Sequence, residues 1–190
     1  MAEIVYHVTT PDRAERCLRE GVYQYRTTLC QEKTLQQDAH YDALRPIHVI
    51  RIGLSRLNSV YAHPNLEVAA TRRNGGWLNR IQGNIAILAI QIAEPDSVYV
   101  ADGLLVAHPH TPPEYWASVV TLEDYRNQQE PTFKAPDWAE KHNAHRPDRW
   151  RSYFYMWPEV LIPNGVKADD LSLVSVIEQQ PGDDDAISMQ

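Results

Sequence analysis

The sequence predicts an α+β fold, in which strands and helices do not alternate regularly. A short strand and an amphipathic helix open the chain over Ile4–Gly21. The most apolar segment, Ile85–Ile92, predicts a central buried strand, and Leu171–Ile177 alternates as a strand near the end of the chain. We expect roughly six strands and two or three short helices, with most strands in the later half, which favours α+β over repeated βαβ units.

Length and composition indicate one globular domain over residues 1–178, followed by an acidic tail over residues 179–190 that we expect to be disordered. The apolar fraction of 43% and the charged fraction of 23% are ordinary for a soluble protein. No apolar run approaches the ~20 residues of a membrane helix, and no secretory leader opens the sequence. We therefore expect a cytoplasmic protein with no membrane partner.

The formal net charge of −7 argues against broad binding to phosphate backbones, although it is compatible with a local basic patch. Cys17 and Cys30 are the two cysteines, and they form no CxxC pair, so we interpret them as reduced thiols. The histidine pairs at His108–His110 and His142–His145 lack flanking carboxylates or cysteines at helical spacing. The sequence therefore predicts no metal site.

The opening unit combines a strand over Ile4–Tyr6 with a helix that begins after Thr10 and ends at Gly21. Thr10 suits the N-cap position, and the proline that follows it suits the first helical position. His7 and Thr9 lie at the corner between the strand and the helix. A histidine at such a corner is well placed to meet a ligand, although a structural role is the common alternative.

Five elements are expected from there to the centre of the chain, with turn residues between them. They are a short helix over Gln31–Ala43, a strand over Ile47–Leu54, a loop over Ser55–Asn65, a short helix over Leu66–Arg73 and the strand over Ile85–Ile92.

The later half is expected to contain a strand over Ser97–Val100 and a short helix within Pro113–Tyr125, with Trp116 and Leu122 inward. A long polar segment, Gln128–Asp148, predicts a functional or mobile loop. The final elements are a strand over Glu159–Ile162, a turn at 163–165 and the closing strand. Glu159 on a strand is either an edge residue pointing to water or a carboxylate whose burial must be compensated.

Two stretches together resemble the ADP-ribosyltransferase fold: YHVTTPDRAERCLREG near the start and PEVLIPNGVKADDL about 150 residues later. In that family an early strand carries a His in a Y-H-x-T setting, a helix ending in Gly follows, and a late strand carries the catalytic Glu. The E-V-L-I-P form is most similar to the DNA-modifying ADP-ribosyltransferase toxins (the DarT group). The tRNA 2′-phosphotransferases share the His-Thr corner. The resemblance covers the two ends of the chain and implies a split β-sheet core around an NAD cleft.

The resemblance implies roles for individual residues. His7 and Thr9 would hold a ribose of NAD, Ser55 would lie against the nicotinamide half, and Glu159 would be the catalytic carboxylate. Breaking the nicotinamide–ribose bond develops an oxocarbenium-like cation, which a carboxylate can stabilise while it activates the nucleophile. NAD is thus expected as the co-substrate.

Two further assignments stay open within the resemblance. Tyr61 or Tyr155 would stack on the nicotinamide ring. Arg51 and Arg56 are both candidates for the pyrophosphate or a substrate charge, because a guanidinium fork matches phosphate oxygens. Arg51 is grouped with the catalytic residues and Arg56 with the NAD-binding residues, but the sequence does not choose between them.

The acceptor is expected to be a nucleic-acid base. Enzymes of this fold that modify arginine usually carry a second Glu two residues before the catalytic one, and Trp157 stands there instead. An aromatic ring at that position suits stacking on a base, with a buried core Trp as the alternative. Arg146, Arg149 and Trp150 lie in a basic, aromatic segment typical of single-strand binding, unless its aromatic rings pack inward.

The sequence therefore favours a mono-ADP-ribosyltransferase in a toxin-like role, with an antitoxin or immunity protein as a possible partner. The alternatives are an RNA 2′-phosphotransferase-like enzyme, a protein-directed ADP-ribosyltransferase, and an inactive nucleotide-binding module.

Overall fold

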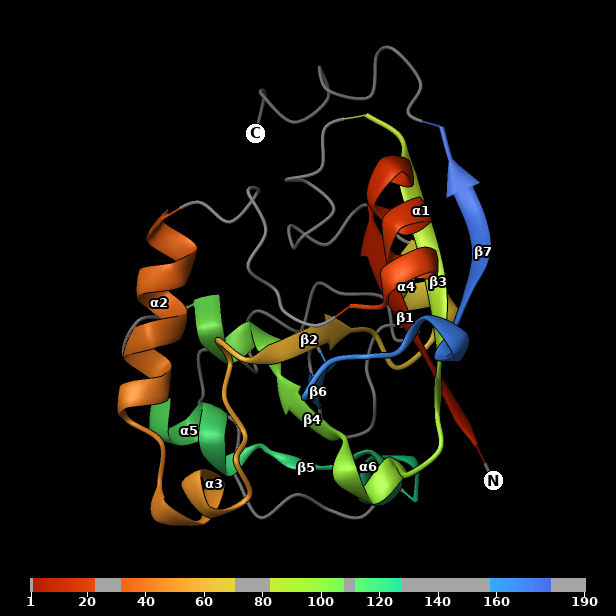
Figure 1. Ribbon diagram of the computed structural model, residues 1–190. Coiled ribbons are helices and arrows are strands. Elements are labelled where there is room, and N and C mark those ends of the chain that lie inside the picture. The colour runs from red at the N-terminus through yellow and green to blue at the C-terminus, as the bar shows by residue number, and fades with distance from the viewer. Residues whose placement is uncertain (1, 23–31, 71–82, 108–111, 128–157, 179–190) are drawn as a thin grey trace.

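A computed structural model of the chain describes residues 2–22, 32–70, 83–107, 112–127 and 158–178 (Figure 1). It contains α-helices and antiparallel sheets, which confirms the α+β class. The strands are β1 (Glu3–Thr9), β2 (Ser59–Ala62), β3 (Ile85–Ile92), β4 (Tyr99–Asp102), β5 (Val120–Thr121), β6 (Pro158–Pro163) and β7 (Leu171–Ile177). The α-helices are α1 (Pro11–Glu20), α2 (Glu32–Ala43), α3 (Ile47–Arg51), α4 (Leu66–Ala70), α5 (Pro112–Ala117) and α6 (Leu122–Arg126). Short 3₁₀ helices lie at Pro95–Ser97, Gly103–Ala107 and Ala168–Asp170.

The strands form two antiparallel sheets, in the orders β1-β3-β7 and β2-β6-β4-β5. In Figure 1, α1 and β7 lie on the side of the first sheet, whereas α2, α3 and α5 gather at the opposite side. The sheets meet where the backbone of Tyr6 in β1 pairs with that of His63 just after β2, through N···O distances of 2.8 and 2.7 Å. β2 is therefore paired with β6 along one edge and touches β1 along the other.

The second sheet separates two buried cores. An aliphatic core lies between the sheets and includes Val5, Leu88, Val160 and Ile162. An aromatic core lies where α2 and α5 pack, and it includes Tyr41, Tyr61, Tyr115, Trp116 and Leu161. Successive side chains of a strand point to opposite faces, so β6 sends Val160 and Ile162 into the first core and Leu161 into the second. Glu159 lies two residues before Leu161, on the same face of β6, and therefore faces the aromatic core.

Several sequence predictions are confirmed. The first helix, the helix ending at Ala43, the buried strand Ile85–Ile92 and the closing strand form as expected. Trp116 and Leu122 are buried, as predicted. β1 continues to Thr9, which pairs with Ala86, so His7 and Thr9 lie within the strand and not at a corner after it.

The predicted strand at Ile47–Leu54 is wrong, because Ile47–Arg51 is the helix α3. Pro46 at the N-cap favours a helix start, and Gly53, at φ +70°, turns the chain after it. Val49 is the buried residue of this turn, and its neighbours on α3 are exposed, so the segment lacks the buried face that an alternating strand would have.

The predicted loop at Ser55–Asn65 contains β2, all four residues of which are buried. The strand expected at Ser97–Val100 begins only at Tyr99, after a 3₁₀ turn. The helix expected within Pro113–Tyr125 is split into α5, β5 and α6. Thr121 causes the last break, since its Oγ1 accepts a hydrogen bond from Asp124 N at 3.0 Å and caps α6.

The helix expected at Leu66–Arg73 forms over Leu66–Ala70, and its last three positions lie outside the described residues. The polar segment Gln128–Asp148 also lies outside them, as does the tail from 179 to 190. Within the part of the chain that the structure describes, no helix is both long and apolar enough to cross a membrane.

Candidate active site

The buried guanidinium of Arg56 lies at the centre of the site, in the loop between α3 and β2, with 3% of the residue exposed. Its Nε donates to Asp38 Oδ1 of α2 at 2.8 Å, and one terminal nitrogen donates to Glu159 Oε1 of β6. The carboxylate side chains are themselves only 3% and 11% exposed. One guanidinium thus joins two buried carboxylates that are far apart in the sequence, an arrangement that is stable only when every charge is paired.

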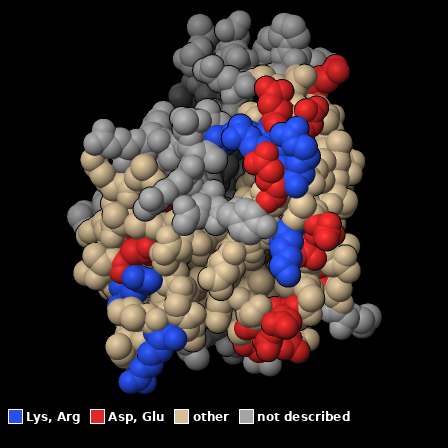
Figure 2. Space-filling model, in the orientation of Figure 1, with Lys and Arg blue, Asp and Glu red and all other residues tan. Residues whose placement is uncertain are grey.

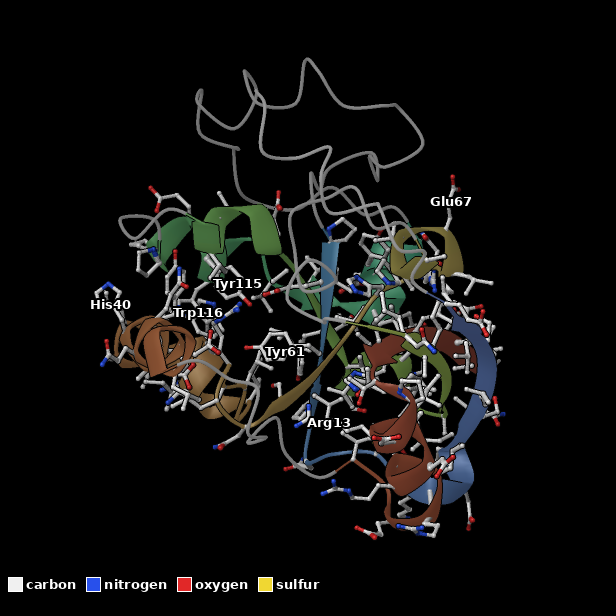
Figure 3. All side chains as sticks on the ribbon, turned by 90° about the horizontal axis from the view of Figure 1, so that it is seen from above. Arg13, His40, Tyr61, Glu67, Tyr115 and Trp116 are labelled. Carbon is white, nitrogen blue, oxygen red and sulfur yellow. The ribbon has the colours of Figure 1, made fainter. Side chains whose placement is uncertain are left out.

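Three tyrosine rings surround this guanidinium. Its Cζ lies 4.7 Å from the ring centre of Tyr115, 5.2 Å from Tyr61 and 5.8 Å from Tyr41. Figure 3 shows Tyr61 and Tyr115 between the helices α2 and α5 and the strands of the second sheet. The faces of aromatic rings attract cations, which offsets part of the cost of burying the charge. Burial opposes the charged form of Arg56, but Glu159, the neighbouring tyrosines and Asp38 outweigh it and raise its pKa.

The tyrosine hydroxyls point to three different acceptors. Tyr41 Oη donates to the carbonyl of Leu105 at 2.8 Å, and Tyr61 Oη donates to the carbonyl of Arg56 at 2.9 Å. Tyr115 Oη donates to Glu159 Oε1 at 2.6 Å. Burial raises the pKa of Tyr61 and of Tyr115 well above the usual value, so both hydroxyls stay protonated and act as donors.

A second carboxylate of α2 holds the loop that carries Arg56. Asp42 accepts hydrogen bonds from the backbone nitrogens of Arg56 at 2.8 Å and Leu57 at 3.2 Å, and from the hydroxyl of Ser55. Buried backbone N–H groups need partners, and this irregular loop obtains them from a side chain. Asp38 and Asp42 are one helical turn apart, so α2 fixes both the guanidinium and its backbone. Burial raises the pKa of Asp38, and Arg56 opposes that shift.

Glu159 is not an edge residue. β6 lies between β2 and β4, and Glu159 is directly opposite Ala101, whose small side chain leaves room on the aromatic face. Both hydrogen bonds that the carboxylate accepts from described residues end on Oε1. Oε2 has no hydrogen-bond partner in the described part of the chain. The carboxylate is therefore fixed through one oxygen, and the other can meet a ligand.

His7 lies at the opposite edge of β2 from Glu159. Its Nδ1 is 2.7 Å from the carbonyl oxygen of Tyr61. A carbonyl only accepts hydrogen bonds, so Nδ1 carries the proton and Nε2 is left as an acceptor. Burial lowers the pKa of His7, and the charge of Arg13 lowers it further, although the bond to Tyr61 acts in the opposite sense. The imidazole is therefore neutral near pH 7.

His63 accompanies His7 where the two sheets meet. Its Nδ1 is buried and has no hydrogen-bond partner among the described residues. Burial, together with the nearby His7, lowers the pKa of His63 to about 4. The junction of the sheets therefore holds two neutral imidazoles.

The structure brings together four of the residues selected from the sequence: Tyr61, Ser55, Arg56 and Glu159. His7 is linked to them through the backbone carbonyl of Tyr61. The ring of Tyr61 packs against Arg56. The hydroxyl of Ser55 donates a hydrogen bond to Asp42 and so helps to hold the loop that carries Arg56. Thr9 is buried at the end of β1. Arg51 is exposed at the end of α3, and no contact between it and Glu159 is present in the described part of the chain. Tyr155, Arg146, Arg149, Trp150 and Trp157 lie outside the described residues.

Sequence reasoning missed Asp38, Asp42, Tyr115 and His63. Two aspartates four residues apart in a predicted helix, beside a tyrosine at position 41, were a weak signal that one helical face carries buried charge. Nothing in the sequence linked Tyr115 to Glu159.

Charges of both signs are interspersed around α1 on the face shown in Figure 2. No group of three or more His, Cys, Asp or Glu side chains that could hold a metal ion occurs among the described residues. A comparison with protein families, curated proteins and solved structures found no match to this chain. The site is therefore interpreted from its own geometry.

Proposed function

We propose that this chain is a mono-ADP-ribosyltransferase, which cleaves the nicotinamide–ribose bond of NAD and transfers ADP-ribose to an acceptor. The observation that carries the proposal is the state of Glu159. This carboxylate is buried inside a sheet, pairs with Arg56, is fixed through Oε1, and has no partner at Oε2 among the described residues. A buried carboxylate with one open oxygen is costly for stability alone, which favours a chemical role.

The residues on either side of β2 fit the ribose half of NAD. His7 Nε2 and Glu159 Oε2 are both hydrogen-bond acceptors, and a ribose offers two hydroxyl donors. Neighbouring strands lie about 4.8 Å apart, so β1 and β6, which flank β2, are roughly 10 Å apart, and a ribose with its substituents would have to bridge that distance. When bound, NAD supplies the labile glycosidic bond and the nicotinamide leaving group.

The charge balance also suits this reaction. Asp38 and Glu159 share a single guanidinium, so the group favours a developing positive charge nearby. As the ribose C1′–nitrogen bond breaks, its electron pair leaves with nicotinamide and the sugar becomes cationic. Glu159 would hold the 2′-hydroxyl and stabilise this cation. It would then take the proton of the acceptor as the acceptor bonds to C1′.

The geometry bears on the two candidate arginines. Arg56 is engaged on both sides by Asp38 and Glu159, so we assign it to holding Glu159 and not to the pyrophosphate. Arg13, in the first turn of α1, is half-buried and acts electrostatically on His7. Figure 3 shows Arg13 on the side of α1 nearer Tyr61. We therefore propose Arg13, in place of Arg51, as the cation that meets the pyrophosphate.

The two sheets, with the His of β1 and the Glu of β6 on either side of β2, support an ADP-ribosyltransferase-like split core. A nucleic-acid base remains the favoured acceptor, because the position two residues before Glu159 is Trp157 and not a second Glu. A toxin-like role, with an antitoxin or immunity protein as partner, follows from the same resemblance. The identity of the acceptor tests both.

The test is incubation of the protein with NAD labelled in the adenylate, in separate pools of DNA, RNA and protein. We expect release of nicotinamide and transfer of label to nucleic acid. Glu159→Gln should lower both by roughly 1000-fold, as expected for loss of a group that stabilises charge in the transition state. Glu94→Gln, an exposed carboxylate, is the matched control and should retain full activity.

No nicotinamide release by the wild-type protein in any pool, or full release by Glu159→Gln, would overturn the proposal. Label transferred to the protein pool alone would leave the reaction standing and change the acceptor.

A further inference from the structure

The two donors on Glu159 differ in kind. Arg56 brings a charge that is shared with Asp38, whereas Tyr115 brings a single hydroxyl that serves Glu159 at 2.6 Å. Both donors converge on Oε1. The terminal torsion of a glutamate side chain is soft, so a carboxylate held by one donor can turn, whereas two donors on the same oxygen fix its plane.

Tyr115 is itself fixed on every side. It is fully buried in α5, and its ring makes edge-to-face contacts with Tyr41 at 5.3 Å and Trp116 at 4.9 Å. Its backbone carbonyl accepts a hydrogen bond from Ser118 Oγ at 2.6 Å. Trp116 is held in turn through its indole N–H, which donates to the Tyr41 carbonyl at 2.8 Å. The hydroxyl of Tyr115 therefore has a defined position before any substrate arrives.

We propose that Tyr115 is a positioning residue, which together with Arg56 holds Glu159 through Oε1 and leaves Oε2 as the oxygen that meets the ribose and the nucleophile. This inference rests on the proposed function, because it names which oxygen of Glu159 acts and what holds it. Tyr115 itself would not touch the substrate. Its contribution is orientation, and small errors in the position of a reacting group are costly to the rate.

Tyr41 provides a matched control. Tyr41 and Tyr115 are both fully buried tyrosines beside Arg56, and both hydroxyls donate a hydrogen bond. Tyr41 donates to the Leu105 carbonyl and makes no hydrogen bond to Glu159. Replacing either tyrosine by phenylalanine keeps the ring and its packing, and removes one hydrogen bond. The two variants should therefore lose similar stability.

The experiment measures nicotinamide release at several NAD concentrations for the wild type, Tyr115→Phe and Tyr41→Phe. We expect Tyr115→Phe to lower kcat by roughly 10- to 100-fold, which is the range for losing one hydrogen bond to a charged group, with KM little changed. Tyr41→Phe should stay within about twofold of the wild-type kcat, since its hydroxyl does not reach Glu159. A purely structural role for Tyr115 predicts instead that the two variants behave alike.

A second readout does not depend on activity. With ¹³C-labelled glutamate, the Cδ signal of Glu159, assigned with Glu159→Gln, is recorded at one neutral pH. Its position and line width report the hydrogen bonds and the order of the carboxylate. The signal should move and broaden in Tyr115→Phe and keep the wild-type position in Tyr41→Phe.

The outcomes separate the two proposals. Turnover by the wild type with an unchanged kcat in Tyr115→Phe overturns the positioning role and leaves the proposed function intact. No turnover by the wild type overturns the proposed function. The Cδ signal of Glu159 then decides the remaining question alone, and the same signal in the wild type and Tyr115→Phe overturns the inference.

Discussion

The two faces of β6 bury side chains of opposite kinds. Val160 and Ile162 enter a core whose fully buried members are aliphatic, whereas Leu161 and Glu159 enter one built from tyrosine and tryptophan rings. The buried charges of Arg56 and Asp38 lie on the aromatic side. Aliphatic side chains offer no hydrogen bonds, while tyrosines offer both a ring face for a cation and a hydroxyl donor.

The difference indicates that one face of β6 contributes mainly to stability, whereas the other face holds the charged groups of the candidate site. Burial of the aliphatic core contributes stability in proportion to apolar area. The aromatic core contributes less stability of this kind, because it also buries charged groups. Away from water, the interactions between those charges are stronger. A strand inside a sheet can serve both, because alternate side chains belong to different environments.

The largest expected effect on stability comes from removing the buried cation that pairs with both Asp38 and Glu159. Arg56→Met leaves Asp38 and Glu159 buried without their partner, which should lower the free energy of unfolding by about 3–5 kcal/mol. Adding Asp38→Asn and Glu159→Gln removes the unpaired charges, so the triple variant should be more stable than Arg56→Met. Urea unfolding followed by circular dichroism measures both. An Arg56→Met variant within about 1 kcal/mol of wild type would show that the charges are not desolvated.

A deletion in the aliphatic core should have a smaller effect that is confined to stability. Ile90 is fully buried in β3, between Val5 and Leu171, and Ile90→Ala should cost about 3 kcal/mol through lost transfer energy and a residual cavity. The rate of NAD turnover per folded molecule should not change, since Ile90 belongs to the aliphatic core and pairs with none of the residues proposed to bind NAD. Unfolding curves and turnover at a temperature where the variant is folded test this together. A large loss of turnover in the folded variant would mean that the two cores are coupled.

The same comparison explains how much the sequence could predict. The opening strand and helix, β3, β6 and β7 were predictable because each carries its own local pattern, such as Thr10-Pro11 at a helix start. α3 was missed because the alternation of Ile47–Arg51 is compatible with either element. Pro46 before it and Gly53 after it favoured the helix.

The aromatic side could be predicted only in part. Val160, Leu161 and Ile162 are all apolar, as is usual for a strand buried on both faces, so alternation does not say which way Glu159 points. Arg56 and Glu159 were candidates for their residue types, but their pairing joins positions 103 residues apart. Such a contact is set by the packing of α2 and α5 on the sheet, and no local propensity encodes it.

The smallest expected effect comes from His63, at the junction between the sheets. Its pKa is about 4 in the folded protein and near 6.5 in an unfolded chain. The unfolded state therefore binds a proton more readily, so stability is fully present above about pH 6.5 and is lost as the pH falls towards 4. Because the side chain is partly exposed, we expect a loss of about 1–2 kcal/mol over this range, less than the full shift implies.

Replacing His63 with Asn should flatten the dependence of the free energy of unfolding on pH in this window, whereas His48→Asn, at an exposed position on α3, should leave it unchanged. Equal slopes in the wild type and the His63 variant would mean that water reaches this imidazole freely, and that the junction between the two sheets is open to solvent.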